Sequence, residues 1–256
     1  MDERSIIEQY ESLIRAISNH IALSIKGDSN TALQKRFKFD SDRGWAFLTS
    51  SMDLLGDTEE AKQNHYRFGL DGPTKYMNLG ERYLRLYGVL NAAYLQESAI
   101  STIGELFKLK DTKQHTRLHG MKLLQFRHIA GSHTVNYQVT SSSGGRKKIP
   151  FMVSRPTLDG DEITVLDDHN KAHDYHLSDL LKEFDSAAQD YLDLVVATMI
   201  QRLHPSPSSK ARIQYEEELH AIRASRKGAI VLRDPISGRI TILAPPDDSD
   251  DPVDVE

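Results

Sequence analysis

The segment 127–133 (RHIAGSH) brings together side chains that can act on a phosphate group. Arg127 stays protonated, and its planar guanidinium can donate to two phosphate oxygens at once. His128 and His133 can take up or release a proton near neutral pH, so either can serve as an acid or a base. On an unbroken helix Arg127 and His133 would lie about 120° apart. We therefore expect the helix to end near Gly131, so that His133 can turn back towards the arginine.

A run of basic residues precedes this segment and ends at Arg127. Positions 108–127 hold six lysines and arginines but a single acid, Asp111. Such a run can attract a phosphate backbone even when the whole chain is acidic. The alternative is a helix face that is simply solvated. We call five of these residues the basic band: Lys108, Lys110, Lys113, Arg117 and Lys122.

Arg127 and His133, separated by five residues, resemble the arginine, four-to-six residues, histidine motif of the HEPN superfamily. These are helical-bundle proteins that include many metal-independent RNA-cutting toxins and defence effectors. The residue after the arginine is often Asn, His or Asp in that family, and here it is His128. The resemblance covers roughly positions 75–134. The alternative is that the arginine and the histidine only cap the end of a helix, through its free carbonyls and dipole.

The resemblance implies an endoribonuclease that uses no metal or cofactor. In it, Arg127, His128 and His133 are catalytic, the basic band binds RNA, and Gln96, Glu97 and Ser132 support the site. It also implies a homodimer with the site at the dimer cleft, and a place in a toxin–antitoxin or antiviral defence system with an antitoxin or defence protein as partner. Some members of the family do not cleave RNA, so a non-catalytic interaction or RNA-binding module is the alternative.

Two other clusters hold potential metal ligands. His173 and His176 lie in a segment rich in acids, but three residues apart on a strand they point to opposite faces. His115 and His119 lie one helical turn apart with no third ligand in sight. We therefore predict no metal site.

Gln96 and Glu97 interrupt an apolar stretch, so we expect them either to line the cleft of Arg127 or to face solvent.

Composition limits the remaining choices. The chain has 256 residues and no cysteine, which excludes disulfides, thiolate metal sites and a cysteine nucleophile. Neither a signal peptide nor an apolar run long enough for a membrane span is visible, so we expect a soluble cytoplasmic protein without membrane contact. The net charge of −5 comes from the last eleven residues, which contain six acids.

Hydrophobic periodicity predicts a mainly α protein with a small β insertion, an α+β class built on an up-and-down, HEPN-like helical bundle with short antiparallel hairpins. The expected helices span about 5–26, 41–55, 58–68, 75–108, 113–131, 178–203 and 209–226. Ser5 with Glu8, and Asp57 with Glu60, fit helix N-terminal caps. The longest helix carries a stripe of Tyr83, Tyr87 and Tyr94, which suits a two-fold interface beside the motif.

Short extended segments separated by turn residues predict strands over about 135–140, 148–154, 162–167, 172–176, 229–233 and 239–243. The expected organisation has five parts. They are a HEPN-like bundle over 1–134, a β excursion over 135–177, helices packing on the bundle over 178–227, a hairpin over 228–245 and a disordered acidic tail over 246–256.

Overall fold

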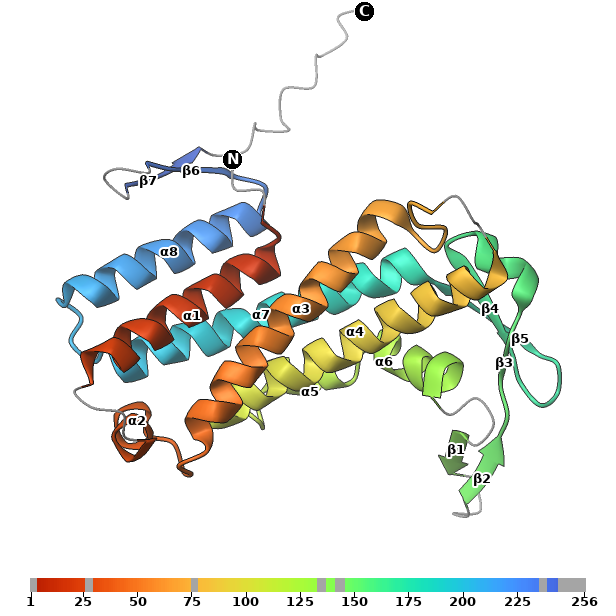
Figure 1. Ribbon diagram of the computed structural model, residues 1–256, viewed down its shortest axis with the longest axis horizontal. Helices are drawn as coiled ribbons and strands as arrows, with labels where there is room; N and C mark the ends of the chain where they lie inside the picture. Colours follow the sequence, from red (N-terminus) through yellow and green to blue (C-terminus); the bar gives the residue numbers. More distant parts are fainter. Residues whose placement is uncertain are drawn as a thin grey trace, which may run out of the picture. The chain divides into compact units, whose positions relative to one another are not determined.

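The computed structural model describes residues 4–25, 30–74, 78–132, 137–140, 146–234 and 239–243 (Figure 1). The chain divides into two units, and each is described by itself. The terminal unit joins residues 1–26 to 196–256, and the central unit comprises residues 27–195. One helix, α7 (Leu177–Leu203), begins in the central unit and ends in the terminal unit.

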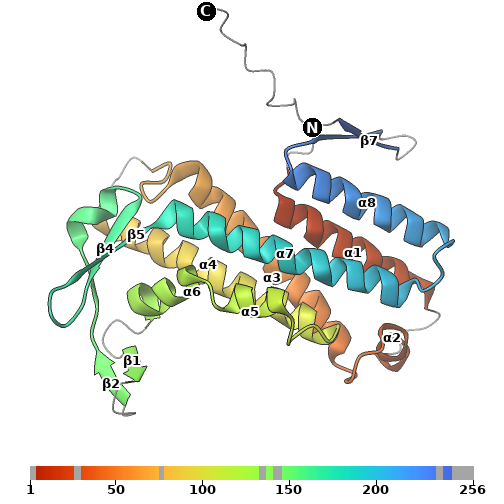
Figure 2. The ribbon, with the colours of Figure 1, turned by 180° about the vertical axis from the view of Figure 1, so that it is seen from behind.

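The terminal unit is built on two long helices and a hairpin. Helix α1 (Ile6–Ser24) begins with the expected capping box, in which Ser5 accepts from the Glu8 backbone N–H and the Glu8 carboxylate accepts from the Ser5 N–H. It packs beside α8 (Lys210–Arg226), and Figures 1 and 2 show the two helices side by side. Strands β6 (Ile230–Arg233) and β7 (Ile240–Leu243) form an antiparallel hairpin that contacts α8.

The central unit is organised around two antiparallel helices, α3 (Gly44–Phe68) and α4 (Leu79–Leu106), which pack together along their length (Figure 1). Helix α2 (Asn30–Phe37) precedes them and buries Phe37. Helices α5 (Lys113–His119) and α6 (Lys122–Arg127) lie along α4 (Figure 2), and the π-helical turn η1 (His128–Ser132) continues α6. The first part of α7 fills the core with Leu181, Phe184, Ala188, Tyr191, Leu192 and Val195.

The β excursion consists of two small antiparallel sheets. In one, β1 (Tyr137–Thr140) pairs with β2 (Arg146–Ile149). In the other, the order is β3 (Met152–Val153), β4 (Glu162–Leu166) and β5 (Ala172–His176). Strand β4 buries Ile163 and Val165, whereas Glu162 is exposed and Thr164 and Leu166 are half-buried, as expected for a sheet with one covered face. The 3₁₀ turn η2 (Arg155–Asp159) joins β3 to β4 and contacts α4.

The mainly helical class with short antiparallel strand pairs is confirmed, but two helix boundaries predicted from the sequence are wrong. The segments 41–55 and 58–68 form one helix, α3, that runs through Gly56, so Asp57 and Glu60 do not cap a second helix. The cost of one glycine, about 1 kcal/mol, is outweighed by packing against α4. The segment 113–131 breaks into α5, α6 and η1, because Met121 is extended, with ψ 139°.

The boundaries of the units also differ from the expected organisation. Helix α1 groups with the C-terminal elements, whereas residues 27–134 group with the β excursion and the first part of α7. Helix α2 and turn η2 were not predicted, since each is short and carries a single strongly buried apolar side chain, Phe37 and Leu158. The acidic tail 246–256 lies outside the described residues.

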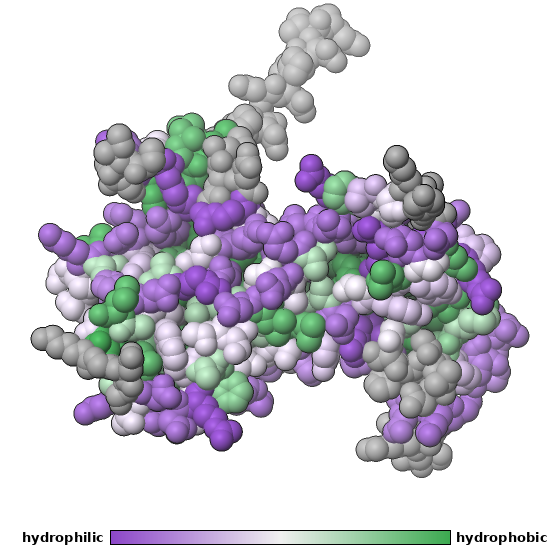
Figure 3. Space-filling view, viewed as in Figure 1, coloured by the Kyte–Doolittle hydropathy of each residue, from purple (hydrophilic) through white to green (hydrophobic). Residues whose placement is uncertain are grey.

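The outer surface of the molecule mixes charged and apolar side chains. The face shown in Figure 3 is largely hydrophilic, with small hydrophobic patches between the polar groups. Within the described ranges, no helix combines the length and the apolar character that a bilayer span requires.

Candidate functional site around Arg127

The predicted motif begins where an α-helix changes into a π-helical turn. Helix α6 ends at Arg127, and the next five residues, His128–Ser132, form η1. Turns of this kind are rare and occur often at functional sites, because the extra residue per turn re-aims the side chains around it. The helical segment ends at Ser132, close to the end expected near Gly131, but its last five residues form a π-helical turn and not an α-helix.

Arg127 is held in place by neutral groups from α4. Its guanidinium carbon lies 4.2 Å from the centre of the Tyr94 ring, a cation–π contact. Its Nη2 donates to the Asn91 side-chain oxygen over 3.2 Å. Among the described residues no carboxylate lies within ion-pairing distance of Arg127. The guanidinium is therefore fixed in orientation while its charge is left uncompensated.

The neighbouring histidine belongs to the same cluster. The ring of His128 meets Tyr94 edge to face, with ring centres 6.1 Å apart. Tyr94 therefore contacts both residues that open the motif, and each is half-buried. Ser132 is the last residue of η1. His133, the predicted proton-transfer residue, follows it directly in the sequence and lies outside the described residues.

The basic band is less cationic in the fold than in the sequence, because acids outside the band form ion pairs with three of its members. Three of its five members form ion pairs: Lys108 with Asp40, Lys110 with Glu105 and Arg117 with Asp190. Lys113 and Lys122 are exposed, and neither has a carboxylate within ion-pairing distance among the described residues. Of the predicted RNA-binding residues, these two keep the charge that such a role needs.

Gln96 and Glu97 occupy different surroundings from those expected. Gln96 is fully buried and donates to the Glu59 carboxylate over 2.9 Å. Glu97 is also buried. Its carboxylate accepts a hydrogen bond from the Ser101 hydroxyl over 2.9 Å and lies within hydrogen-bond distance, 3.2 Å, of the Nδ1 of His119. Neither residue faces solvent. The hydrogen bond of Gln96 is directed into the core, so Gln96 contributes no contact to Arg127.

The partner of Gln96 belongs to a buried ionic network that sequence reasoning missed. Lys62, on α3, is fully buried and forms ion pairs with Glu59 (2.9 Å) and Asp185. The Tyr66 hydroxyl donates to Asp185 over 2.8 Å. Burial raises the pKa of Asp185, although the charge of Lys62 acts in the opposite direction. The only sequence signal was the i, i+3 spacing of Glu59 and Lys62, which is common on exposed helix faces.

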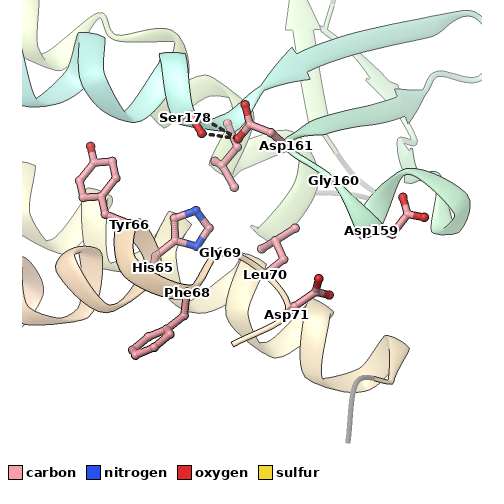
Figure 4. Close-up of a pocket in the computed structure, with 11 residues that line it drawn as sticks. His65, Tyr66, Phe68, Gly69, Leu70, Asp71, Asp159, Gly160, Asp161 and Ser178 are labelled. Carbon is pink, nitrogen blue, oxygen red and sulfur yellow. Dashed lines mark hydrogen bonds between the residues drawn. The ribbon is translucent and has the colours of Figure 1, made fainter. Parts of the chain in front are cut away.

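A second candidate site is a cleft of about 260 Å³ at the end of α3, shown in Figure 4. Its polar lining includes His65, Asp71, Asp159 and Asp161. Burial lowers the pKa of His65, partly opposed by Asp161. The Asp161 carboxylate, however, accepts from the backbone N–H of Ser178 (2.8 Å), so it caps the first turn of α7.

The metal-ligand clusters considered from the sequence have other partners. His173 Nε2 lies 3.1 Å from the Asp167 carboxylate, a hydrogen bond that lowers the pKa of Asp167 to about 2, with help from the backbone N–H of Lys171. His115 and His119 stack with ring centres 6.3 Å apart. Across the ranges that the structure describes, no group of three or more His, Asp or Glu side chains is arranged to hold a metal ion.

Comparisons of the chain with protein-family models, curated proteins and solved structures gave no match. The geometry around Arg127 and the sequence of its motif are therefore the features of the chain that bear on its function.

Proposed function

We propose that this protein is a metal-independent endoribonuclease of the HEPN type, acting in a toxin–antitoxin or antiviral defence system. The observation that carries the proposal is the setting of Arg127. The arginine is oriented by an aromatic face and an amide oxygen, at 4.2 and 3.2 Å, instead of by a carboxylate. A guanidinium held in this way keeps its full charge for an anion and needs little reorganisation to bind one.

The chemistry assigned to the motif is attack by the ribose 2′-oxygen on the adjacent phosphorus. A bond forms between that oxygen and phosphorus, the bond from phosphorus to the 5′-oxygen breaks, and a 2′,3′-cyclic phosphate results. A histidine takes the 2′-OH proton, and the departing 5′-oxygen receives a proton. We assign the proton transfers to His133 and His128, and the stabilisation of the extra phosphoryl charge to Arg127.

A second copy of the chain would supply a second set of these groups. Helix α4 offers a free surface for this, since Leu84 is 67% exposed and Gly88 has open space where a side chain would stand. Tyr94, expected from the sequence to take part in an interface, instead contacts Arg127 and His128. We propose a homodimer through the face of α4 that carries Leu84 and Gly88, with Tyr83 and Tyr87 outside the interface.

The test is cleavage of a labelled single-stranded RNA by the full chain in EDTA. Arg127→Ala, His128→Ala and His133→Ala are compared with a matched control, Arg67→Ala. Arg67 also lies over an aromatic ring, at 5.2 Å from the centre of Phe68, but away from the motif. We expect cleavage that survives EDTA and leaves a 2′,3′-cyclic phosphate. The motif variants should lose it while the control keeps it.

Absence of cleavage by the wild-type chain over a broad set of RNA sequences would contradict the proposal. Activity that needs added metal, or that Arg127→Ala and His133→Ala leave intact, would contradict it as well. RNA binding without cleavage would instead favour a non-catalytic RNA-binding module.

A further inference from the structure

A groove lined by aromatic and aliphatic side chains lies next to the Arg127 site. Its volume is about 710 Å³, and its walls come from α4, β3, η2 and β4. Tyr83 and Tyr87 form the α4 wall, with ring centres 5.6 Å apart. Phe151 and the exposed Met152 form part of the opposite wall. Such a groove offers flat apolar faces to a ligand that can insert rings.

One residue that lines the groove, Tyr87, lies close to the motif. A side-chain carbon placed at Gly131 in η1 would stand 3.8 Å from the Tyr87 ring, so the π turn borders the groove. Tyr87 and Tyr94 are seven residues apart on α4, which places them on nearly the same side of the helix and about 10 Å apart along it. A chain molecule bound at Arg127 can therefore reach the groove within about three stacked nucleotides.

The charge of the groove also selects among ligands. Among the described residues that line it, Arg155 is the only charged one and none is an acid. Arg155 is exposed and has no carboxylate within ion-pairing distance among the described residues. Together with Arg127, it places one cation in the groove and one beside it. This arrangement is complementary to a polyanion that carries apolar rings.

We infer that the groove of Tyr83, Tyr87 and Phe151 binds unpaired bases of single-stranded RNA, next to the phosphate held at Arg127. The inference rests on the proposed function and names its substrate class. Bases paired in a duplex are stacked on one another and cannot turn their faces to a protein groove, whereas unpaired bases can. Stacking on tyrosine and phenylalanine is tolerant of sequence, so we expect a preference for single strands and little discrimination between bases.

The test measures binding separately from cleavage. The probe is a fluorescent single-stranded RNA of eight nucleotides with a methyl group on every 2′-oxygen, so that it cannot be cut by 2′-oxygen attack. Fluorescence anisotropy in EDTA at fixed salt compares the full chain with Tyr87→Ala, Tyr83→Ala and Tyr87→Phe. Phe47→Ala is the matched control, because Phe47 is a 53% exposed aromatic of the same unit outside the groove.

We expect each tyrosine-to-alanine change to weaken binding by about 5- to 150-fold, the range that loss of one stacked base gives. Tyr87→Phe keeps the ring and should bind like the wild type, as should Phe47→Ala. A duplex of the same sequence should bind more weakly than the single strand. Tyr87 is 43% exposed, and circular dichroism will verify that its variants stay folded.

Equal affinity of wild type and Tyr87→Ala, equal affinity for duplex and single strand, or no binding to the wild type would each overturn the inference. The two proposals fail separately. Groove-dependent binding with no cleavage of unmethylated RNA would support the groove and reject the ribonuclease. Cleavage and binding that ignore Tyr83 and Tyr87 would reject the groove alone.

Discussion

Replacing the buried lysine of the central unit, Lys62→Met, should destabilise that unit strongly. Lys62 is the cation between two carboxylates, Glu59 and Asp185, whose side chains are 1% and 15% exposed. Methionine fills a similar volume but leaves both acids without their counter-ion. Removing one partner of a buried pair costs about 3–5 kcal/mol.

The remaining hydrogen bonds place the loss near the lower end of that range. Glu59 keeps the amide donors of Gln63 and Gln96, at 2.8 and 2.9 Å, and Asp185 keeps the Tyr66 hydroxyl at 2.8 Å. We therefore expect a loss of about 3 kcal/mol in the free energy of unfolding at pH 7.5. A second change, Asp185→Asn, should recover part of this loss, because it removes one of the two stranded charges.

The loss should also depend on pH. Burial already raises the pKa of Asp185 against the effect of Lys62, so removing Lys62 raises it further. An acid whose pKa is raised by folding favours the folded state below its unfolded pKa, and that contribution disappears as the pH rises through its folded pKa. The cost of Lys62→Met should therefore be smaller at pH 5 than at pH 7.5.

Urea unfolding followed by tryptophan fluorescence suits the measurement, because the single tryptophan, Trp45, lies on α3 in the same unit as the network. Lys182→Met, on an exposed lysine of the same unit, is the control and should cost little. A loss below about 1 kcal/mol for Lys62→Met, or one that does not change between pH 5 and 7.5, would refute the reasoning about a buried, charge-dependent network.

Two further predictions concern the same core. Gly104→Ala should lower the free energy of unfolding by about 1–2 kcal/mol, because its new side-chain carbon would stand 1.9 Å from the Tyr191 hydroxyl. This overpacking outweighs the gain in helix propensity. Adding Tyr191→Phe should recover part of the loss, as measured in a double-mutant cycle by urea unfolding. Asp185→Asn should gain stability relative to the wild type as the pH rises from 4 to 7.5. The wild type loses stability over that interval because the pKa of Asp185 is raised in the folded state, whereas the amide does not titrate. A relative loss of stability by the variant would contradict the effect of burial on Asp185.

Local signals predicted much of the secondary structure. The capping box at Ser5 and Glu8 placed the start of α1, and turn compositions placed β5 at its observed bounds, Ala172–His176. The errors arose where packing overrides local preference. Gly56 is accommodated inside α3 because that helix packs along α4, which no local pattern reveals.

The sequence motif identified the residues of the candidate site, but it revealed only part of their surroundings. The motif named Arg127 and His128, whereas their shared contact with Tyr94 depends on how α6 packs against α4. The basic band looked uncompensated because the acids that neutralise it, such as Asp40 and Asp190, lie 68 and 73 residues away from their partners. Interactions between residues so far apart cannot be derived from spacing alone.

The most direct test of the central claim is the single-turnover rate of RNA cleavage by Arg127→Ala and by its control, Arg67→Ala, in EDTA. If Arg127 stabilises the phosphoryl charge in the transition state, its loss should slow cleavage by about 10²- to 10³-fold, as for other removed transition-state donors. The control should cleave at the wild-type rate. Equal rates for the wild type and Arg127→Ala would contradict the account.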